Sequence, residues 1–170
     1  SHDLSKEIKE IYSKFILKFE QRYPLAFQEL SEVKRSYGND NLYFYLPTGI
    51  IPHNEYEVYL ENQLKTIPDK NAIFIVKPHG NDIGRDYCSY FNALGQKSLV
   101  FDNEIITFIP IEFLTLFFEG STILSSYSTA HLYMKWWFNK ETVFAEVKGS
   151  AENKELIREY RSVYSDMQNL

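Results

Sequence analysis

Apolar residues recur every three or four positions through residues 3–36, which is the spacing of an amphipathic helix. Pro24 interrupts this pattern and predicts two consecutive helices rather than one. Residues 37–40 then read as a turn. The residues expected on the apolar face of the first helix are Leu4, Ile8, Ile11, Phe15 and Phe19.

After residue 40 the pattern changes to short apolar runs separated by helical segments. The apolar runs predict strands at 42–46, 72–76, 98–101, 122–124 and 142–145. The segments between and after them predict helices at 52–66, 87–94, 110–118, 130–137 and 153–167, with Gly95 and Gly120 as two of the stops.

The predicted strands are apolar throughout rather than alternating, which is typical of a parallel sheet covered on both faces. We therefore expect an α/β fold, with a Rossmann-like parallel sheet of about five strands, helices on both faces and an N-terminal helical segment. Residues 1–40 would form that segment, and residues 41–170 would form the Rossmann-like domain.

The composition and net charge of the chain argue against several classes of function. The net charge of −5 over 170 residues gives no reason to expect nucleic-acid binding. Cys88 is the single cysteine and can form no internal disulfide, so a reducing, cytoplasmic location is expected. The sequence shows no metal-ligand spacing of histidines, and it lacks the glycine patterns of dinucleotide and P-loop sites. We expect no metal and no cofactor.

Polar clusters follow three of the predicted strands. Thr48-Gly49 follows the first strand, residues 77–81 follow the second, and residues 125–129 follow the fourth. Ligands of such sheets bind outside the carboxyl ends of the strands, so these clusters predict one site. Ser128 and Thr129 stand where a strand gives way to a helix, and they suit both phosphate binding and helix capping.

Three further residues suit a phosphorylated ligand. His79 is able to donate a hydrogen bond or a proton to a phosphate, and Gly80 allows close approach of the backbone; a surface-loop histidine is the alternative. Glu112 in the first turn of its helix suits ribose hydroxyls, or simply the helix dipole. The charged residues that follow His79, namely Asp82, Arg85 and Asp86, are expected to form a solvated loop.

Three segments in order resemble motifs of bacterial sialyltransferases, especially the capsular polysialyltransferases. They are Lys77-Pro78-His79, Pro110-Ile111-Glu112-Phe113-Leu114 and Ser125-Ser126-Tyr127-Ser128-Thr129-Ala130, and the resemblance covers roughly residues 42–138. Those enzymes are GT-B glycosyltransferases, which have two Rossmann-like domains, and they use CMP-sialic acid to build capsule or surface polysaccharide.

The resemblance implies a role for each candidate residue. His79 would contact the donor phosphate and assist its departure, while Ser128 and Thr129 would bind the same phosphate. Glu112 would hold the ribose. Thr48, Gly49, Lys77 and Gly80 would line the nucleotide.

Two departures from that family matter. Gly80 stands where the family usually has proline after the histidine. The acidic motif that holds the family's general base lies in an N-terminal domain, and this sequence shows no such element.

We expect the chain to bind nucleotide weakly and to transfer nothing alone. A further domain or a partner chain would bind the glycan acceptor. The exposed apolar surface against which that domain would pack would allow dimerisation. Peripheral association with the inner membrane stays open.

Two alternatives remain. Teichoic-acid-type capsule polymerases are also GT-B enzymes with short histidine motifs, and they use CDP-glycerol or a related donor. A diphosphate donor would be expected to require more positive charge than Lys77 and the helix amides provide. The second alternative is a non-catalytic interaction module, which the aromatic surplus and Trp136-Trp137-Phe138 favour.

Overall fold

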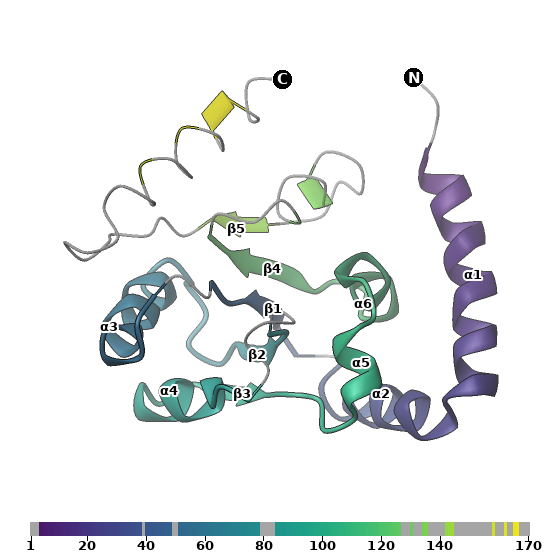
Figure 1. The fold of residues 1–170 in the computed structure, drawn as a ribbon, viewed down its shortest axis with the longest axis horizontal. Helices are drawn as coiled ribbons and strands as arrows, with labels where there is room; N and C mark the ends of the chain where they lie inside the picture. Colours follow the sequence, from purple (N-terminus) through teal and green to yellow (C-terminus); the bar gives the residue numbers. More distant parts are fainter. Residues whose placement is uncertain are drawn as a thin grey trace.

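The computed structural model describes residues 4–38, 40–48, 51–78, 84–126, 130, 134–135, 142–144, 158, 162 and 165–166. Within these residues a single sheet lies between two groups of helices (Figure 1). The α/β class with a Rossmann-like parallel sheet, predicted from the apolar strands, is confirmed.

Five strands form the sheet in the part of the chain that the structure describes, in the order β3-β2-β1-β4-β5. Every neighbouring pair is parallel. The central strand β1 pairs through Tyr43 with Phe74 of β2 on one side and with Thr122 of β4 on the other. The strands are β1 (Leu42–Leu46), β2 (Ile73–Val76), β3 (Lys97–Leu99), β4 (Thr122–Ser125) and β5 (Thr142–Phe144).

The helices agree closely with the sequence pattern. Their bounds are α1 (Leu4–Arg22), α2 (Pro24–Tyr37), α3 (His53–Leu64), α4 (Tyr87–Ala93), α5 (Glu104–Thr107) and α6 (Ile111–Phe117). Pro24 separates α1 from α2, and Gly95 and Gly120 follow α4 and α6 with φ of +70° and +81°, which glycine adopts without steric cost. The short helix α5 was not predicted. The helices predicted at 130–137 and 153–167 fall mostly outside the described residues.

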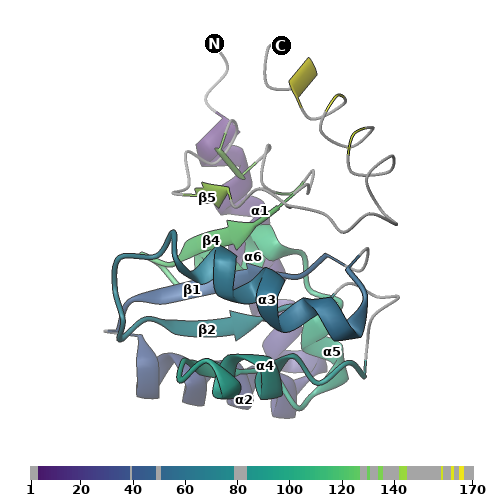
Figure 2. The same ribbon diagram turned by 90° about the vertical axis from the view of Figure 1, so that its left-hand side faces the viewer.

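The two faces of the sheet carry separate hydrophobic clusters, because successive side chains of a strand point to opposite faces. Tyr43 and Tyr45 of β1 pack with α3 and α4, whereas Leu42 and Phe44 pack with the helices of the other face. Figure 2 shows α3 lying over the first of these faces. Burial on both faces explains why the strands have no polar alternation.

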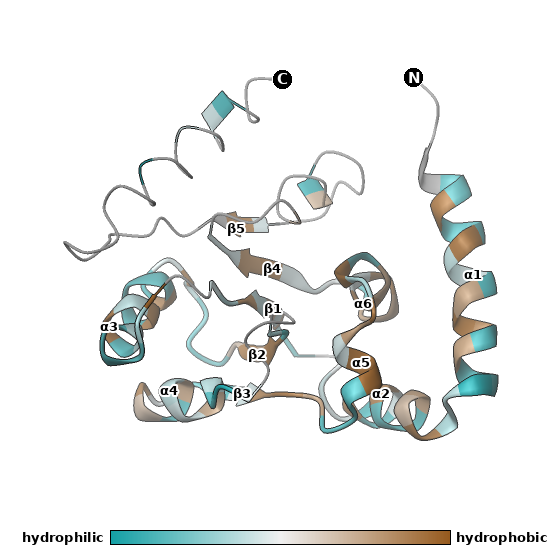
Figure 3. Cartoon of the chain, viewed as in Figure 1, coloured by the Kyte–Doolittle hydropathy of each residue, from teal (hydrophilic) through white to brown (hydrophobic). Residues whose placement is uncertain are grey.

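The N-terminal helices pack on the second face. Phe15 of α1 lies with its ring centroid 4.5 Å from that of Phe113, and Phe19 and Leu30 are buried in the same cluster as β1 residues. Figure 3 shows apolar and polar positions mixed along α1. The expected apolar face was wrong at Ile11, whose side chain is 57% exposed, because Tyr12 takes the inward position.

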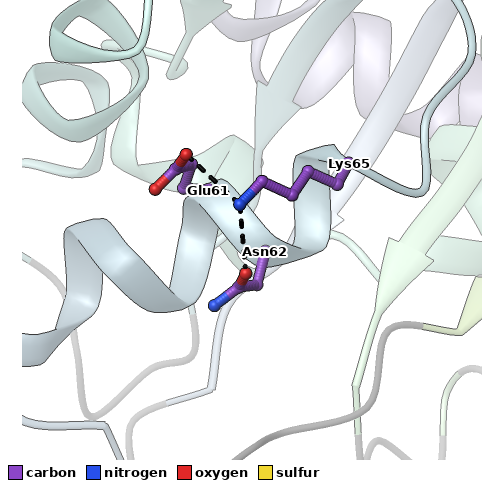
Figure 4. A network of polar contacts seen from close by, with 3 residues as sticks. All are labelled: Glu61, Asn62 and Lys65. Carbon is purple, nitrogen blue, oxygen red and sulfur yellow. Dashed lines mark hydrogen bonds and ion pairs between the residues drawn. The ribbon is translucent and has the colours of Figure 1, made fainter.

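The outer surface of α3 is solvated. Lys65 Nζ lies 3.3 Å from Glu61 Oε1 and donates to Asn62 Oδ1 at 3.4 Å (Figure 4). The side chains of the ion pair are 62% and 51% exposed, so the pair contributes little to stability. In the described residues, no helix has both the length and the apolar character that crossing a membrane requires.

Candidate functional site

The chain order of the strands places the expected ligand site beside β1 and β4. From β1 the chain moves outward to β2 and β3, then crosses over to β4 on the opposite side of β1. Ligands of open α/β sheets bind at such a switch point, outside the carboxyl ends of the strands. Leu46 and Ser125 are the last residues of the two strands and pair with each other there.

Lys77 stands directly after β2 at this edge. Its backbone N–H donates to Tyr45 O at 3.0 Å, which continues the parallel ladder by one residue. Its Nζ donates to the carbonyl oxygen of Thr107 at 2.9 Å. Burial lowers the pKa of the Lys77 ammonium below its usual range, and the negative charge of Glu112 opposes that shift. The side chain is therefore held in place with part of its hydrogen-bonding capacity already used.

Glu112 lies in the first turn of α6, as predicted, and Pro110 is the residue before that helix. Its charge acts on Lys77, so the structure brings these two predicted site residues into one electrostatic environment. Thr48 is half-buried after β1. The other predicted site residues, Gly49, His79, Gly80, Ser128 and Thr129, lie outside the described residues.

The polar segment after β4 begins inside the protein. Ser125 and Ser126 are both buried, and Tyr59 of α3 donates from its hydroxyl to Ser126 Oγ at 3.1 Å. This contact fixes the end of β4 against α3. The hydrogen bond from Tyr59 therefore positions the start of the segment that contains Ser128 and Thr129.

Arg85 is a residue that the sequence analysis misread. The expectation that it belongs to a solvated loop was wrong, because its guanidinium packs against aromatic rings. Its Cζ lies 4.3 Å from the ring centroid of Tyr56, 5.5 Å from that of Tyr87 and 5.9 Å from that of Tyr90. Its Nη2 donates to Ile51 O at 3.1 Å. Arg85 thus ties the segment after β1 to the segment that enters α4.

The acidic neighbour of Arg85 also has a structural role. Asp86 is the N-cap of α4 and accepts a hydrogen bond from Ser89 N at 3.1 Å. Hydrogen bonds from the Ser89 hydroxyl and backbone N–H lower the pKa of its carboxyl group. Asp86 therefore defines the residue at which α4 begins. The repeated Tyr-x-x-Tyr spacing at 56–59 and 87–90 was the available sequence signal for this cluster.

Replacing Arg85 with alanine is expected to lower the free energy of unfolding by about 2–4 kcal/mol. The change removes a charged hydrogen bond and cation–π contacts shielded from solvent. Chemical denaturation measures this change in the free energy of unfolding. The matched control is Arg22→Ala on the surface, where the guanidinium lies 5.8 Å from the Tyr23 ring; we expect less than about 0.5 kcal/mol there. Equal effects of the two substitutions would contradict the structural role of Arg85.

Within the described residues, no group of three histidine, cysteine, aspartate or glutamate side chains is arranged to hold a metal ion. Cys88 is a free, half-buried thiol on α4. The lysine and carboxylate at the carboxyl edge remain the polar groups best placed for a ligand.

No family model, no curated protein and no solved structure matches this chain.

Proposed function

We propose that this chain is the donor-binding domain of a sialyltransferase-like GT-B glycosyltransferase, and that it binds the nucleotide of CMP-sialic acid at the carboxyl edge of the sheet. The observation that carries the proposal is that Lys77, directly after β2, and Glu112, in the first turn of α6, both stand at the carboxyl edge of the sheet, where Lys77 is held by its hydrogen bonds to Tyr45 O and Thr107 O. Lys77 and Glu112 belong to separate motifs of the sialyltransferase resemblance, and the negative charge of Glu112 acts on the Lys77 ammonium.

The chemistry of this pair suits a nucleoside monophosphate. A carboxylate accepts hydrogen bonds from both hydroxyls of a ribose, which is the role proposed for Glu112. An ammonium group has three donors, and Lys77 gives one to Thr107 O, so two are left to serve a ligand oxygen. The Glu112 carboxylate would bind the ribose, and the Lys77 ammonium would bind the phosphate of the nucleotide.

An exposed aromatic ring follows the residue that accepts the hydrogen bond from Lys77. Phe108 follows Thr107 directly, and its side chain is 70% exposed. Burying such a ring against a flat partner is favourable, and nucleobases are flat partners of this kind. We assign Phe108 the stacking face for the base, which gives the site a contact for each part of a nucleotide.

The reaction we propose is inverting transfer. An acceptor hydroxyl attacks the anomeric carbon of the sialyl donor, the bond from that carbon to the phosphate oxygen breaks, and CMP leaves with the bonding electrons. The proton of the acceptor passes to a base on another domain or partner chain. His79, Ser128 and Thr129 keep their sequence-based roles as hydrogen-bond donors to the departing phosphate.

The test is a titration of the isotope-labelled protein with CMP, followed by backbone amide NMR, with UMP and CDP as comparison ligands. We expect CMP to shift the amides of Lys77 and Glu112 with a dissociation constant near or below about 1 mM. Glu112→Gln is expected to weaken CMP binding about tenfold to hundredfold, because it removes charged hydrogen bonds to the ribose. Glu61→Gln on the outer surface of α3 is the matched control and should leave binding unchanged.

The comparison ligands separate the alternatives. Tighter binding of CDP than of CMP would favour the polymerases that use CDP-glycerol. An equal response to UMP would remove the cytidine assignment and keep a nucleotide site. Absence of binding by all three nucleotides would favour an interaction module, for which Ile11, Leu17 and Leu25 supply exposed apolar side chains on the N-terminal helices.

A further inference from the structure

The crossover between β3 and β4 carries one of the groups that hold Lys77. After Leu99 the chain leaves the sheet, forms α5 and continues through Phe108 into α6. Thr107 is the last residue of α5, and its carbonyl oxygen accepts the hydrogen bond from Lys77 Nζ at 2.9 Å. The position of the Lys77 ammonium therefore depends on where α5 lies.

A carboxylate from the N-terminal helices holds the start of α5. Glu29 of α2 accepts hydrogen bonds from two consecutive backbone N–H groups, with Asp102 N at 2.6 Å from its Oε1 and Asn103 N at 3.0 Å from its Oε2. Asn103 is the N-cap of α5, and its side chain accepts from Ile105 N at 3.1 Å. Figure 1 shows α5 beside α2. The two oxygens of one carboxylate thus fix the point at which the chain enters α5.

The short helix α5 joins this attachment to the hydrogen bond with Lys77. It has four residues, Glu104–Thr107, and Ile106 N–H donates to Asn103 O at 3.0 Å. A displacement at Asn103 is therefore transmitted to the Thr107 carbonyl within about one helical turn. Ile106 is fully buried in the second core cluster, so the core holds one side of α5 and Glu29 holds its start.

We propose that Glu29 is a positioning residue, which acts through α5 to set the place of the Lys77 ammonium at the nucleotide site. The inference rests on the proposed function for the identity of the ligand, whereas the connection from Glu29 to Lys77 is tested without any ligand. It gives α2, from the N-terminal helical segment, a part in binding at the carboxyl edge of the sheet.

The two hydrogen bonds from the backbone require a carboxylate. An ionised carboxylate is acceptor-only and serves both N–H groups, whereas a glutamine amide has one acceptor oxygen and would direct its NH₂ group at the other donor. Glu29→Gln therefore keeps the size of the side chain and removes one of the two attachments. The matched control is Glu32→Gln on the same helix, where Glu32 Oε1 accepts from Gln28 Nε2 at 2.9 Å on the exposed surface.

The first measurement is a titration with CMP at a temperature where circular dichroism shows each variant to be folded. Glu29→Gln is expected to raise the dissociation constant for CMP about threefold to tenfold, because Lys77 is displaced, and Glu32→Gln is expected to leave it unchanged. A loss of global stability alone leaves the dissociation constant of the folded protein unchanged. An equal dissociation constant in the wild type and in Glu29→Gln would overturn the proposal.

The second measurement needs no nucleotide. The side-chain NMR resonances of Lys77 are expected to shift in Glu29→Gln and to stay in place in Glu32→Gln. Unshifted Lys77 resonances in Glu29→Gln would show that the buried side of α5 holds it alone, and would overturn the proposal. If these resonances shift while CMP fails to bind the wild type, the connection from Glu29 to Lys77 stands and the proposed nucleotide function fails.

Discussion

Replacing Phe74 with alanine is expected to lower the free energy of unfolding by about 3–5 kcal/mol. The Phe74 side chain is fully buried in β2, and its ring centroid lies 5.5 Å from that of Tyr43 and 5.0 Å from that of Phe91. The substitution removes this packing and leaves a cavity between the sheet and α4. A domain of this size is stabilised by about 5–15 kcal/mol, so the loss would be a large share of the total. Urea denaturation followed by circular dichroism measures it.

The matched control for Phe74→Ala is Phe108→Ala, the same substitution at a side chain that is 70% exposed. It is expected to change the free energy of unfolding by less than about 0.5 kcal/mol, because little packing is lost. If Phe108 stacks on a base as proposed, this variant also binds CMP more weakly. Equal destabilisation by the two substitutions would contradict the burial of Phe74 and the register of β2 with it.

The fold was largely predictable because its signals are local. Five apolar runs separated by helical segments predict a parallel sheet, since a helix between two strands returns the chain to the same edge. Strand ends were less certain. β3 covers Lys97–Leu99 rather than residues 98–101, because Val100 and Phe101 leave the ladder, and Phe101 still enters the second core cluster. The single turn of α5 is too short to produce a recognisable periodicity.

The site was predictable only in part. Lys77 and Glu112 were predicted as site residues because one follows a strand and the other lies in the first turn of a helix, and the structure places them at those positions of the fold. Arg85 was misread because its contacts with Tyr56 and Ile51 join distant parts of the chain, and no local pattern encodes them.

The arrangement around Arg85 also connects fold and site. The residues that fix the segments after β1 and β2 lie on the same face as the buried tyrosines of the first core cluster. Tyr45 of the central strand bonds through its hydroxyl to the hydroxyl of Tyr56 and donates to Gln63 Oε1 at 2.8 Å. Arg85 covers the ring of that same Tyr56. The position of the candidate site therefore depends on a cluster of buried phenol groups.

That cluster makes the protein sensitive to alkali. Burial, and then the nearby phenols of Tyr56 and Tyr59, raise the pKa of Tyr45 well above its ordinary value of 10.0. Because the folded pKa exceeds the unfolded one, this contribution to stability is fully present below pH 10 and is lost progressively as the pH rises above it. Each proton that unfolding releases lowers the free energy of unfolding by about 1.4 kcal/mol per pH unit.

Tyr12 adds a smaller contribution to the same alkaline loss. Burial, and secondarily the charge of Glu119, raise the pKa of Tyr12 from 10.0 to about 12. The contribution of Tyr12 to stability is therefore lost between pH 10 and about pH 12. This side chain is half-exposed, and solvent screening reduces its contribution. We therefore expect Tyr45 to dominate the slope of stability against pH, with Tyr12 adding a shallow contribution.

Denaturant titrations at several values between about pH 8 and 11 test this expectation. Tyr45→Phe is expected to be less stable at pH 8, because Tyr56 and Gln63 lose a hydrogen-bond partner, and to lose less stability than the wild type above pH 10. Tyr23→Phe, which removes a surface phenol, is the matched control for loss of a hydroxyl group. A Tyr45→Phe profile as steep as that of the wild type would show that the alkaline loss arises elsewhere, and the buried phenols would then hold the segments after β1 and β2 through packing alone.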